Sequence, residues 1–546
     1  MANGDGKAVT IVDSEPNLAG PLSVAVASLC ERLQPQVCAR SAAGFREVLR
    51  RLSAPLQVAV AGRISSGKST LVNALIGRQV APKDIGECTR LVTRFSYGTA
   101  DRIEMVFTDG RKQVLPFDAE GMIPADLGVD VRKVSHLEAY LTNAVLKDLT
   151  VIDTPGLGSL DSASVSRAEV LLGVGRGDGS AGSASAASMA DAADPEAEFD
   201  DLDEVSASAV AGAEAVLYVF TQAVRADDAQ ALAAFTAATA GREAGPVNAL
   251  ALLNKADTIA AESVHGADGD AWRAATLLAA KQARTLKPRV ADVLPVIGLL
   301  AESAESGGFT STDADALRQL AEIDDADLRT MLISADIFAS WESSVPSGTR
   351  HRLLEKLDLY GITVAVEILR AEPKITAGAL RRRLLDASGM AEVQRRLDTV
   401  FRGRADGIKA AAALASVTAL AHASGDPGER QRVHDAIEVL LARPEAHQFR
   451  LLEALTLVSS GAVDMPEDLA EEVFRVGSNR DIGEQLGMPG RPVHELTAYA
   501  LERAGWWRSF ASFGATPAQG RVAHVVHRAY FLTWQQLREA TTEVKR

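Results

Sequence analysis

Several residue types and patterns are scarce in this sequence, and each shortage excludes a class of protein. Only three of the 546 residues are cysteine, an odd number without Cys-x2-Cys spacing, which argues against a disulfide framework or structural zinc. No stretch reaches about 18 uninterrupted apolar residues, and the best, 410–423, contains Ser416, Thr418 and His422. The N-terminus lacks the apolar core of a secretory signal. We therefore expect a cytoplasmic protein whose contact with any membrane is peripheral.

Aromatic residues and positive charge are also scarce. Phe, Trp and Tyr make up 5% of the chain and alanine is abundant, a composition that favours helices outside any nucleotide-binding part. The formal net charge of −15 argues against a protein that holds phosphate backbones, so we expect no nucleic-acid partner. The length is too great for one compact core and predicts about three or four domain-sized pieces.

The sequence does contain a strand, a loop and a helix in the order that phosphate binding requires. An apolar run at 58–61 leads into Gly62-x4-Gly67-Lys68-Ser69, which opens an apolar-periodic helix. The glycines let backbone N–H groups approach phosphate oxygens, and the positive end of the helix points at the same anion. Lys68 is expected to reach the β- and γ-phosphates, and Ser69 to hold Mg²⁺. The predicted nucleotide-binding residues here are Gly62, Ser66, Gly67, Lys68, Ser69 and Thr70.

Two later loops carry candidate metal ligands. Thr89 lies 20 residues after Ser69 in a segment without periodicity, and GTP-hydrolysing domains have a second Mg²⁺ ligand here that the γ-phosphate orders. A buried strand ends at Asp153 and is followed by Thr-Pro-Gly, so its carboxylate would face the metal and the Gly156 N–H the γ-phosphate. Alone, each would be a capping or turn residue; their order after the phosphate loop favours the functional interpretation.

A strand over 249–254 ends in Asn254-Lys255-Ala256-Asp257, and this loop predicts which base is bound. The Asp257 carboxylate can accept from both the ring N–H and the exocyclic amine of guanine, a pair that adenine lacks. Asn254 can bond the purine and tie its loop to the phosphate loop, while the Lys255 stem covers the ring face. A site built for a donor pair rejects the analogue that lacks it, so GTP is the predicted substrate.

The remaining chain divides by periodicity. Residues 1–53 hold amphipathic helices, 54–312 the nucleotide-binding part, and 313–546 further helices. The predicted fold class is an α/β P-loop GTPase domain, a mostly parallel sheet with flanking helices, plus an all-α helical part. The last helix can return to the N-terminal helices, or each chain end can pack on its nearest domain. Predicted strands are 91–97, 102–108, 112–115, 148–153, 215–220, 249–254 and 292–301, and a predicted helix covers 226–240. Helical periodicity also runs over 390–423, which Gly403 and Gly407 interrupt; this segment would form one long helix if it is continuous.

Residues 173–208 differ in composition from their surroundings. They are rich in Gly, Ala and Ser and carry nine acidic residues against one arginine, which is −8 of the net −15. We interpret this stretch as a disordered or weakly ordered insertion. Two roles stay open for it: a solvated loop, or an electrostatic brake on a nucleotide switch or on self-association.

Together the motifs resemble those of the dynamin-like GTPase superfamily, and more narrowly the actinobacterial dynamin-like proteins of the isoniazid-inducible and sporulation-septum types. The resemblance covers about half of the chain at motif level, and by position Ser65 is similar to the serine that steadies the phosphates during catalysis. Ile64 stands where eukaryotic dynamins place a glutamine that orients the attacking water. The residues that carry the resemblance are Gly62-Arg-Ile-Ser-Ser-Gly-Lys-Ser-Thr70, Asn73-Ala-Leu-Ile-Gly77, Glu87-Cys-Thr-Arg90, Asp153-Thr-Pro-Gly-Leu-Gly158 and Asn254-Lys-Ala-Asp257.

The resemblance implies a GTPase domain on a helical neck and trunk, with Ser65, Lys68 and Thr89 as catalytic residues. Ser69, Thr89 and Asp153 would hold Mg²⁺. It also implies association through the GTPase domain, as a homodimer or with a dynamin-like paralogue, and binding to anionic membrane on the inner face of the cell membrane, for remodelling at the division septum or under cell-wall stress. The alternative is a soluble GTP-dependent switch whose helical part binds a protein.

Overall fold

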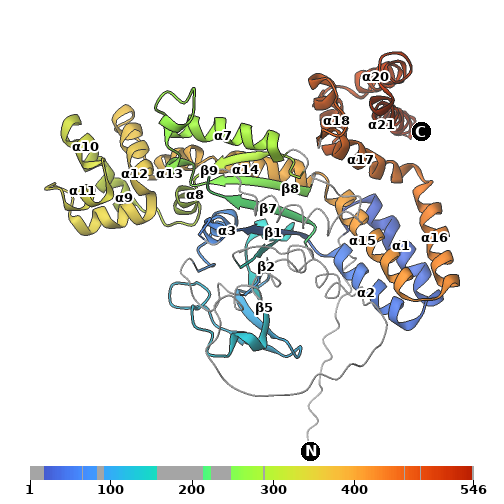
Figure 1. Ribbon diagram of the computed structural model, residues 1–546, viewed down its shortest axis with the longest axis horizontal. Helices are drawn as coiled ribbons and strands as arrows, with labels where there is room; N and C mark the ends of the chain where they lie inside the picture. Colours follow the sequence, from blue (N-terminus) through green and yellow to red (C-terminus); the bar gives the residue numbers. More distant parts are fainter. Residues whose placement is uncertain are drawn as a thin grey trace, which may run out of the picture.

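The computed structural model describes residues 18–63, 65–82, 91–155, 213–222, 248–286, 289–459, 461–479 and 481–543. A nine-stranded sheet in the order β4-β3-β5-β2-β6-β1-β7-β8-β9 lies at the centre of the molecule (Figure 1). From β6 to β9 all neighbours run parallel, as β2 and β5 do, whereas β2–β6, β3–β5 and β3–β4 are antiparallel. The strands are β1 (Leu56–Gly62), β2 (Thr93–Tyr97), β3 (Arg102–Phe107), β4 (Lys112–Leu115), β5 (Val134–Leu141), β6 (Leu149–Asp153), β7 (Ala215–Phe220), β8 (Ala249–Asn254) and β9 (Val293–Val296).

The mostly parallel sheet with flanking helices confirms the predicted fold class. Strands β7 and β8 are buried throughout, as expected of parallel strands covered on both faces. The predicted last strand, 292–301, is too long, because β9 ends at Val296 and α8 (Gly298–Glu305) follows. Strand β5 is not predicted by the sequence analysis. The predicted helix 226–240 lies outside the described residues.

Helices cover both faces of the central strands. One face packs against α7 (Ala271–Leu286) and continues without a break into the hydrophobic core of the helices after residue 312. The other face packs against α3 (Lys68–Ile76) and reaches α14 (Met390–Arg396) and α15 (Ala405–Ala423). The predicted domain limits at 53 and 312 stay predictions. The helices that join the first core are α8, α9 (Ser311–Ala321), α10 (Asp325–Met331), α11 (Ala335–Ser340), α12 (Ser347–Ala371) and α13 (Ala377–Ala387).

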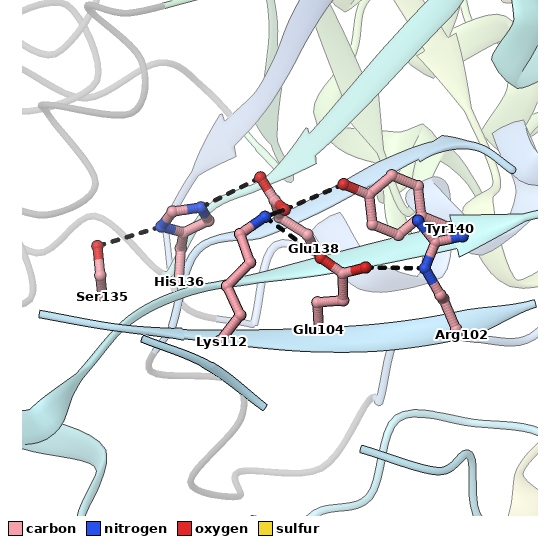
Figure 2. Close-up of polar contacts among 7 residues, drawn as sticks. All are labelled: Arg102, Glu104, Lys112, Ser135, His136, Glu138 and Tyr140. Carbon is pink, nitrogen blue, oxygen red and sulfur yellow. Dashed lines mark hydrogen bonds and ion pairs between the residues drawn. The ribbon is translucent and has the colours of Figure 1, made fainter. Parts of the chain in front are cut away.

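The outer strands β3, β4 and β5 carry a polar network on one face (Figure 2). Lys112 lies between two carboxylates, 3.2 Å from Glu104 and 2.8 Å from Glu138. The Arg102 guanidinium pairs with Glu104 at 2.8 Å and lies 3.9 Å from the centroid of the Tyr140 ring. Hydrogen bonds from His136, Lys112 and Tyr140 hold the pKa of Glu138 well below its usual value despite partial burial. These cross-strand pairs stabilise the extension of the sheet.

The two N-terminal helices pack against α15 and α16 (Pro427–Leu441), at the opposite side of the molecule from α9–α12 (Figure 1). Neither α1 (Pro21–Leu33) nor α2 (Ala39–Ser53) has a capping side chain of its own. Asp406 accepts from the N–H groups of Leu22 and Ser23 at 3.0 and 2.8 Å, and Glu429 accepts from the Cys38 N–H at 2.8 Å. Carboxylates from distant helices therefore cap both N-termini.

A second helical group forms its own core at the C-terminal end of the chain. Its last helix packs on three others of the group, and it lines a cavity of about 380 Å³ together with Ala19–Pro21 at the start of α1. The return of the last helix to the N-terminal helices of residues 1–53, the predicted neck, stays a prediction. The members of the group are α17 (His447–Ser459), α18 (Glu467–Ser478), α19 (Ile482–Leu486), α20 (Val493–Phe513) and α21 (Pro517–Glu543).

The segment 390–423 is not one continuous helix, and its interruption lies beside Gly403, one of the two glycines that mark it in the sequence. A π-helical turn, Leu397–Arg402, separates α14 from α15, and Arg404 has non-helical backbone angles. A Cβ on Gly403 would lie 2.3 Å from the Ser478 carbonyl oxygen of α18. The irregular turn therefore brings the backbone of this segment against α18, which local periodicity does not reveal.

Candidate active site

The phosphate loop depends on two glycines with positive φ. Gly62, at the end of β1, has φ 149°, and a Cβ there would lie 2.2 Å from the Val219 carbonyl oxygen. Gly67, just before α3, has φ 86°, and a Cβ there would lie 2.3 Å from Asn254 Nδ2. Ser65 between them is also left-handed, with φ 62°. These conformations form the turn in which successive N–H groups can converge on an anion at the start of a helix.

Lys68 is held over this loop. Its side chain is buried, and Nζ donates to the Arg63 carbonyl at 2.9 Å. Burial lowers the pKa of Lys68, while the nearby charge of Asp153 raises it. Because Arg63 belongs to the phosphate loop, the Lys68 ammonium group can exchange this carbonyl for the oxygen atoms of a phosphate bound in the loop.

Ser69 and Asp153 form the part of the site that fits a hard cation. The Ser69 hydroxyl donates to Asp153 Oδ2 at 2.9 Å, which joins α3 to the end of β6. Asp153 Oδ1 is buried and has no hydrogen-bond partner among the described residues. Burial raises the pKa of this carboxyl to about 6, against the opposing effects of Lys68 and Ser69. The Ser69 hydroxyl and the Asp153 carboxylate are oxygen ligands of the kind that Mg²⁺ prefers, and the buried Asp153 Oδ1 still lacks a hydrogen-bond partner among the described residues.

Asn254 joins the base-recognition loop to the phosphate loop. The side chain is buried, its Nδ2 donates to the Ser66 carbonyl at 2.8 Å, and its Oδ1 accepts from the Gly298 N–H at 2.9 Å. The predicted tie between the two loops is therefore present. One N–H and one lone pair of the amide remain for the purine.

Asp257 and Lys255 lie beside this tie. Burial raises the pKa of Asp257, the charge of Asp358 on α12 raises it further, and Lys255 lowers it. Lys255 has φ 55°, a left-handed turn that redirects the chain at the end of β8. A partly desolvated carboxylate strengthens its hydrogen bonds to the N–H groups of a bound base.

The structure thus brings most of the predicted site residues to one edge of the sheet, at the carboxyl ends of β1, β6 and β8, where ligands of open α/β sheets bind. Ile64, Thr89 and Gly156 lie outside the described residues. Gly298 begins α8, and its N–H donates to Asn254 Oδ1. The sequence analysis does not predict the buried pair of Asn73 and Glu302 behind the phosphate loop.

The described residues contain no group of three or more His, Cys, Asp and Glu side chains that could hold a metal ion. None of the helices in the described ranges combines the length and the apolar character that crossing a bilayer requires.

Comparison with known proteins agrees with this geometry. The dynamin family model matches residues 58–235. The isoniazid-induced protein IniC of Mycobacterium tuberculosis is 30% identical over 469 residues, which span 85% of this chain and 86% of that protein. The chain belongs to the dynamin family. It is a bacterial dynamin-like GTPase, as the sequence predicts.

More distant relatives match shorter regions. The dynamin-like protein 2 of Campylobacter jejuni is 24% identical over 127 residues, which are 23% of this chain and 21% of that protein. The bacterial dynamin-like protein of Nostoc punctiforme is 28% identical over 130 residues, 21% of this chain and 18% of that protein. A solved structure of an oligomerised bacterial dynamin pair aligns with a TM-score of 0.28 and 12% identity, covering 96% of this chain and 77% of that one.

Proposed function

We propose that this GTPase hydrolyses GTP to GDP and phosphate and couples its nucleotide state to self-association and to the binding and reshaping of an anionic membrane. The observation that carries the chemistry is the convergence of Ser69, Asp153 and the Asn254 loop on the phosphate loop. Because no covalent intermediate is needed, catalysis rests on positioning and on charge stabilisation.

Each residue has a specific part in this mechanism. Backbone N–H groups of the loop and Lys68 hold the phosphates, Ser65 steadies them, and Asp257 with Asn254 and Lys255 selects guanine. Ser69, Asp153 and Thr89 would hold Mg²⁺, which supplies positive charge to the transferring phosphoryl group when bound. The Gly156 N–H would meet the γ-phosphate. The roles of Thr89, Gly156 and Ser65 follow from their order in the motifs and from family resemblance.

The membrane part of the proposal is supported by the hairpin of α20 and α21. From 503 to 538 the sequence contains five arginines and no acidic residue, in a chain of net charge −15. At the tip of the hairpin Phe513 is 92% exposed, and Trp506 is stacked on Phe510 and 39% exposed, whereas Trp507 is fully buried. The aromatic cluster is thus divided between core and surface. Exposed aromatic rings among arginines suit the interface of an anionic bilayer.

Sedimentation with vesicles of phosphatidylcholine and phosphatidylglycerol tests this part of the proposal. We expect the protein to pellet with these vesicles, with a different fraction bound in GDP and in a non-hydrolysable GTP analogue. Lys68→Ala should abolish the nucleotide difference. Phe513→Ser should reduce pelleting, whereas Val493→Ser, which removes another exposed apolar side chain of α20, should not.

The same experiment separates the proposal from its alternative. If the protein hydrolyses GTP but stays in the supernatant in every nucleotide state, the membrane role is wrong. The helical part is then better explained as a docking surface for a protein partner. Self-association is tested by light scattering of the same nucleotide states, and the proposed place of action, the inner face of the membrane at the septum, by a fluorescent fusion in cells.

A further inference from the structure

A buried amide and carboxylate join the phosphate-loop helix to α8. Asn73 lies on α3, one helical turn beyond Ser69, and its Nδ2 donates to Glu302 Oε1 on α8 at 2.9 Å. Both residues are 0% exposed. Burying a carboxylate costs free energy, because the group loses its hydration, and apolar side chains can join two helices without this cost. The pair therefore calls for an explanation beyond packing.

Asn73 also holds the chain that follows α3. Its Oδ1 accepts from the N–H groups of Val80 and Ala81 at 2.9 and 2.8 Å, and its Nδ2 donates to the Ala81 carbonyl at 2.9 Å. All four hydrogen-bonding positions of the amide are thus used. Glu302 Oε1 accepts at one end of the amide, so the Nδ2 group is the end that faces Glu302. The amide oxygen is then left to bind Val80 and Ala81.

The other end of α8 is bonded to the base-recognition loop. Gly298, the first residue of α8, donates to Asn254 Oδ1, and a Cβ at this position would lie 2.9 Å from that oxygen. Asn254 in turn donates to the Ser66 carbonyl of the phosphate loop. One short helix therefore sets three parts of the site relative to one another: the base loop, the phosphate loop and the segment at 80–81.

We propose that Asn73 and Glu302 are positioning residues for GTP hydrolysis. They hold Val80 and Ala81, from which the chain continues to Thr89, in a fixed place relative to Ser69. The inference rests on the proposed function of Thr89 as a ligand of Mg²⁺ that positions the attacking water. Val80 and Ala81 lie outside the phosphate and base loops to which the proposed function assigns GDP binding. Loss of the pair should therefore slow hydrolysis without weakening GDP binding.

Two substitutions of similar volume test the pair in the full-length protein. Glu302→Gln keeps an acceptor for Asn73 Nδ2, whereas Glu302→Met removes it. We expect Glu302→Met to lower kcat about tenfold or more while the Kd for GDP changes by less than about twofold. Glu302→Gln should restore kcat to within about threefold of the wild-type value. Glu305→Met, on the half-exposed side of the same helix, is the matched control.

Three results would overturn the inference: an unchanged kcat in Glu302→Met, a loss of GDP affinity in proportion to the loss of kcat, or equal impairment of the Gln and Met variants. Thr89→Ala separates this inference from the proposed function. A wild-type kcat in Thr89→Ala contradicts the function proposed for Thr89. A reduced kcat there, together with a wild-type kcat in Glu302→Met, contradicts only the inference about the pair.

A second set of variants keeps the test valid if Glu302→Met does not fold. In Asn73→Asp a carboxylate faces the Glu302 carboxylate and the Ala81 carbonyl, so kcat should fall. In the double variant Asn73→Asp/Glu302→Gln, the new amide can donate to the new carboxylate, and kcat should be higher than in Asn73→Asp alone. A double variant as slow as the single variant, or slower, would contradict the role of this hydrogen bond.

Discussion

At the residue scale, Asp153 shows how burial of one carboxyl group sets the conditions under which the site can work. Burial raises its pKa to about 6, and Lys68 and Ser69 only partly oppose this. Protonation would remove the negative charge that a hard cation needs, so a proton and Mg²⁺ compete for the same oxygen atoms.

The first prediction concerns the pH dependence of nucleotide binding. We expect the Mg²⁺-dependent affinity for a GTP analogue to weaken as the pH falls through about 6, because Asp153 then becomes protonated. Asp153→Asn should bind weakly and without this pH dependence. Binding isotherms between about pH 5 and 8 measure the effect. Equal affinity of the wild-type protein across this range contradicts the prediction.

The same group has the opposite effect on the stability of the nucleotide-free protein. A carboxyl group whose pKa is raised by folding stabilises the folded state fully only below its unfolded pKa. Its contribution is lost as the pH rises through about 6. Binding and stability should therefore respond to pH in opposite directions at this residue.

The residues of the nucleotide-binding motifs could be predicted because the chemistry of each depends on its neighbours in sequence. Gly62 and Gly67 need positive φ, and Lys68 and Ser69 open the helix that binds the phosphate. The pair of Asn73 and Glu302 could not be predicted, because the two residues are 229 positions apart and no spacing relates them. In the sequence alone, Glu302 cannot be distinguished from a glutamate on the surface of a helix.

At the element scale, the capping of α1 and α2 by distant carboxylates is the feature with the clearest energetic consequence. Asp406 accepts from two N–H groups of α1, which has no side-chain cap of its own. Glu429 accepts from the Cys38 N–H and also from the Ser41 hydroxyl, the latter at 2.5 Å. The caps orient the N-terminal helices on α15 and α16.

We therefore expect Asp406→Ala to lower the free energy of unfolding by about 1–2 kcal/mol, because two buried N–H groups lose their acceptor. Asp435→Ala is the control, since this carboxylate on α16 is exposed and accepts from Gln431 in its own helix. Urea titration followed by circular dichroism measures both variants. Equal effects of the two substitutions would show that the long-range cap does not contribute.

Backbone strain in α12 leads to a prediction of the opposite sign. The helix is interrupted at Asp358, with φ 54° and ψ 179°, a region that only glycine occupies readily. Asp358→Gly should raise the free energy of unfolding by about 0.5–1 kcal/mol after the entropic cost of glycine is included. Asp358→Ala should give no such gain. Thermal denaturation measures the change, and a lower melting temperature for the glycine variant contradicts the argument.

The elements differ in how far the sequence predicts them. The buried strands 215–220 and 249–254 are confirmed at both ends, because continuous apolar runs bounded by polar residues mark them. The strand at 134–141 alternates buried Leu137, Ala139 and Leu141 with polar residues and could have been found. Gly403 marks the interruption of 390–423 in the sequence, but the close approach of this glycine to α18, distant in sequence, could not be predicted.

At the scale of the whole molecule, the hydrophobic cores are separate. Among the described residues, two lie on the faces of the sheet, a third joins α1 and α2 to α15, α16 and Phe449 of α17, and a fourth is formed by α17–α21. The fourth core has its own polar anchor, because Glu472 accepts from Trp507 Nε1 at 3.0 Å and from the Tyr530 hydroxyl at 2.5 Å. The C-terminal group can therefore unfold as a unit of its own.

Calorimetry should resolve this division. We expect Mg²⁺ and GDP to raise the transition temperature of the part that contains the sheet and to leave that of α17–α21 unchanged. Glu472→Ala should destabilise only α17–α21, lowering the free energy of unfolding of this part by roughly 3 kcal/mol. The reason is that Arg503, the Trp507 indole N–H and the Tyr530 hydroxyl lose a buried acceptor. GTP hydrolysis without lipid should be retained in this variant. A single transition that responds to both the ligand and the substitution contradicts the division.

The distant caps of α1 and α2 also have a consequence for biosynthesis. Asp406 follows Leu22 by 384 residues, so at about 5–20 residues per second the ribosome needs roughly 20–80 s to supply the partner of the first helix. During that time the apolar stripe of α1 has left the ribosomal exit tunnel without α15 to cover it. Nascent chains of this protein should therefore depend on a ribosome-bound chaperone, and slow codons before residue 406 should increase their aggregation.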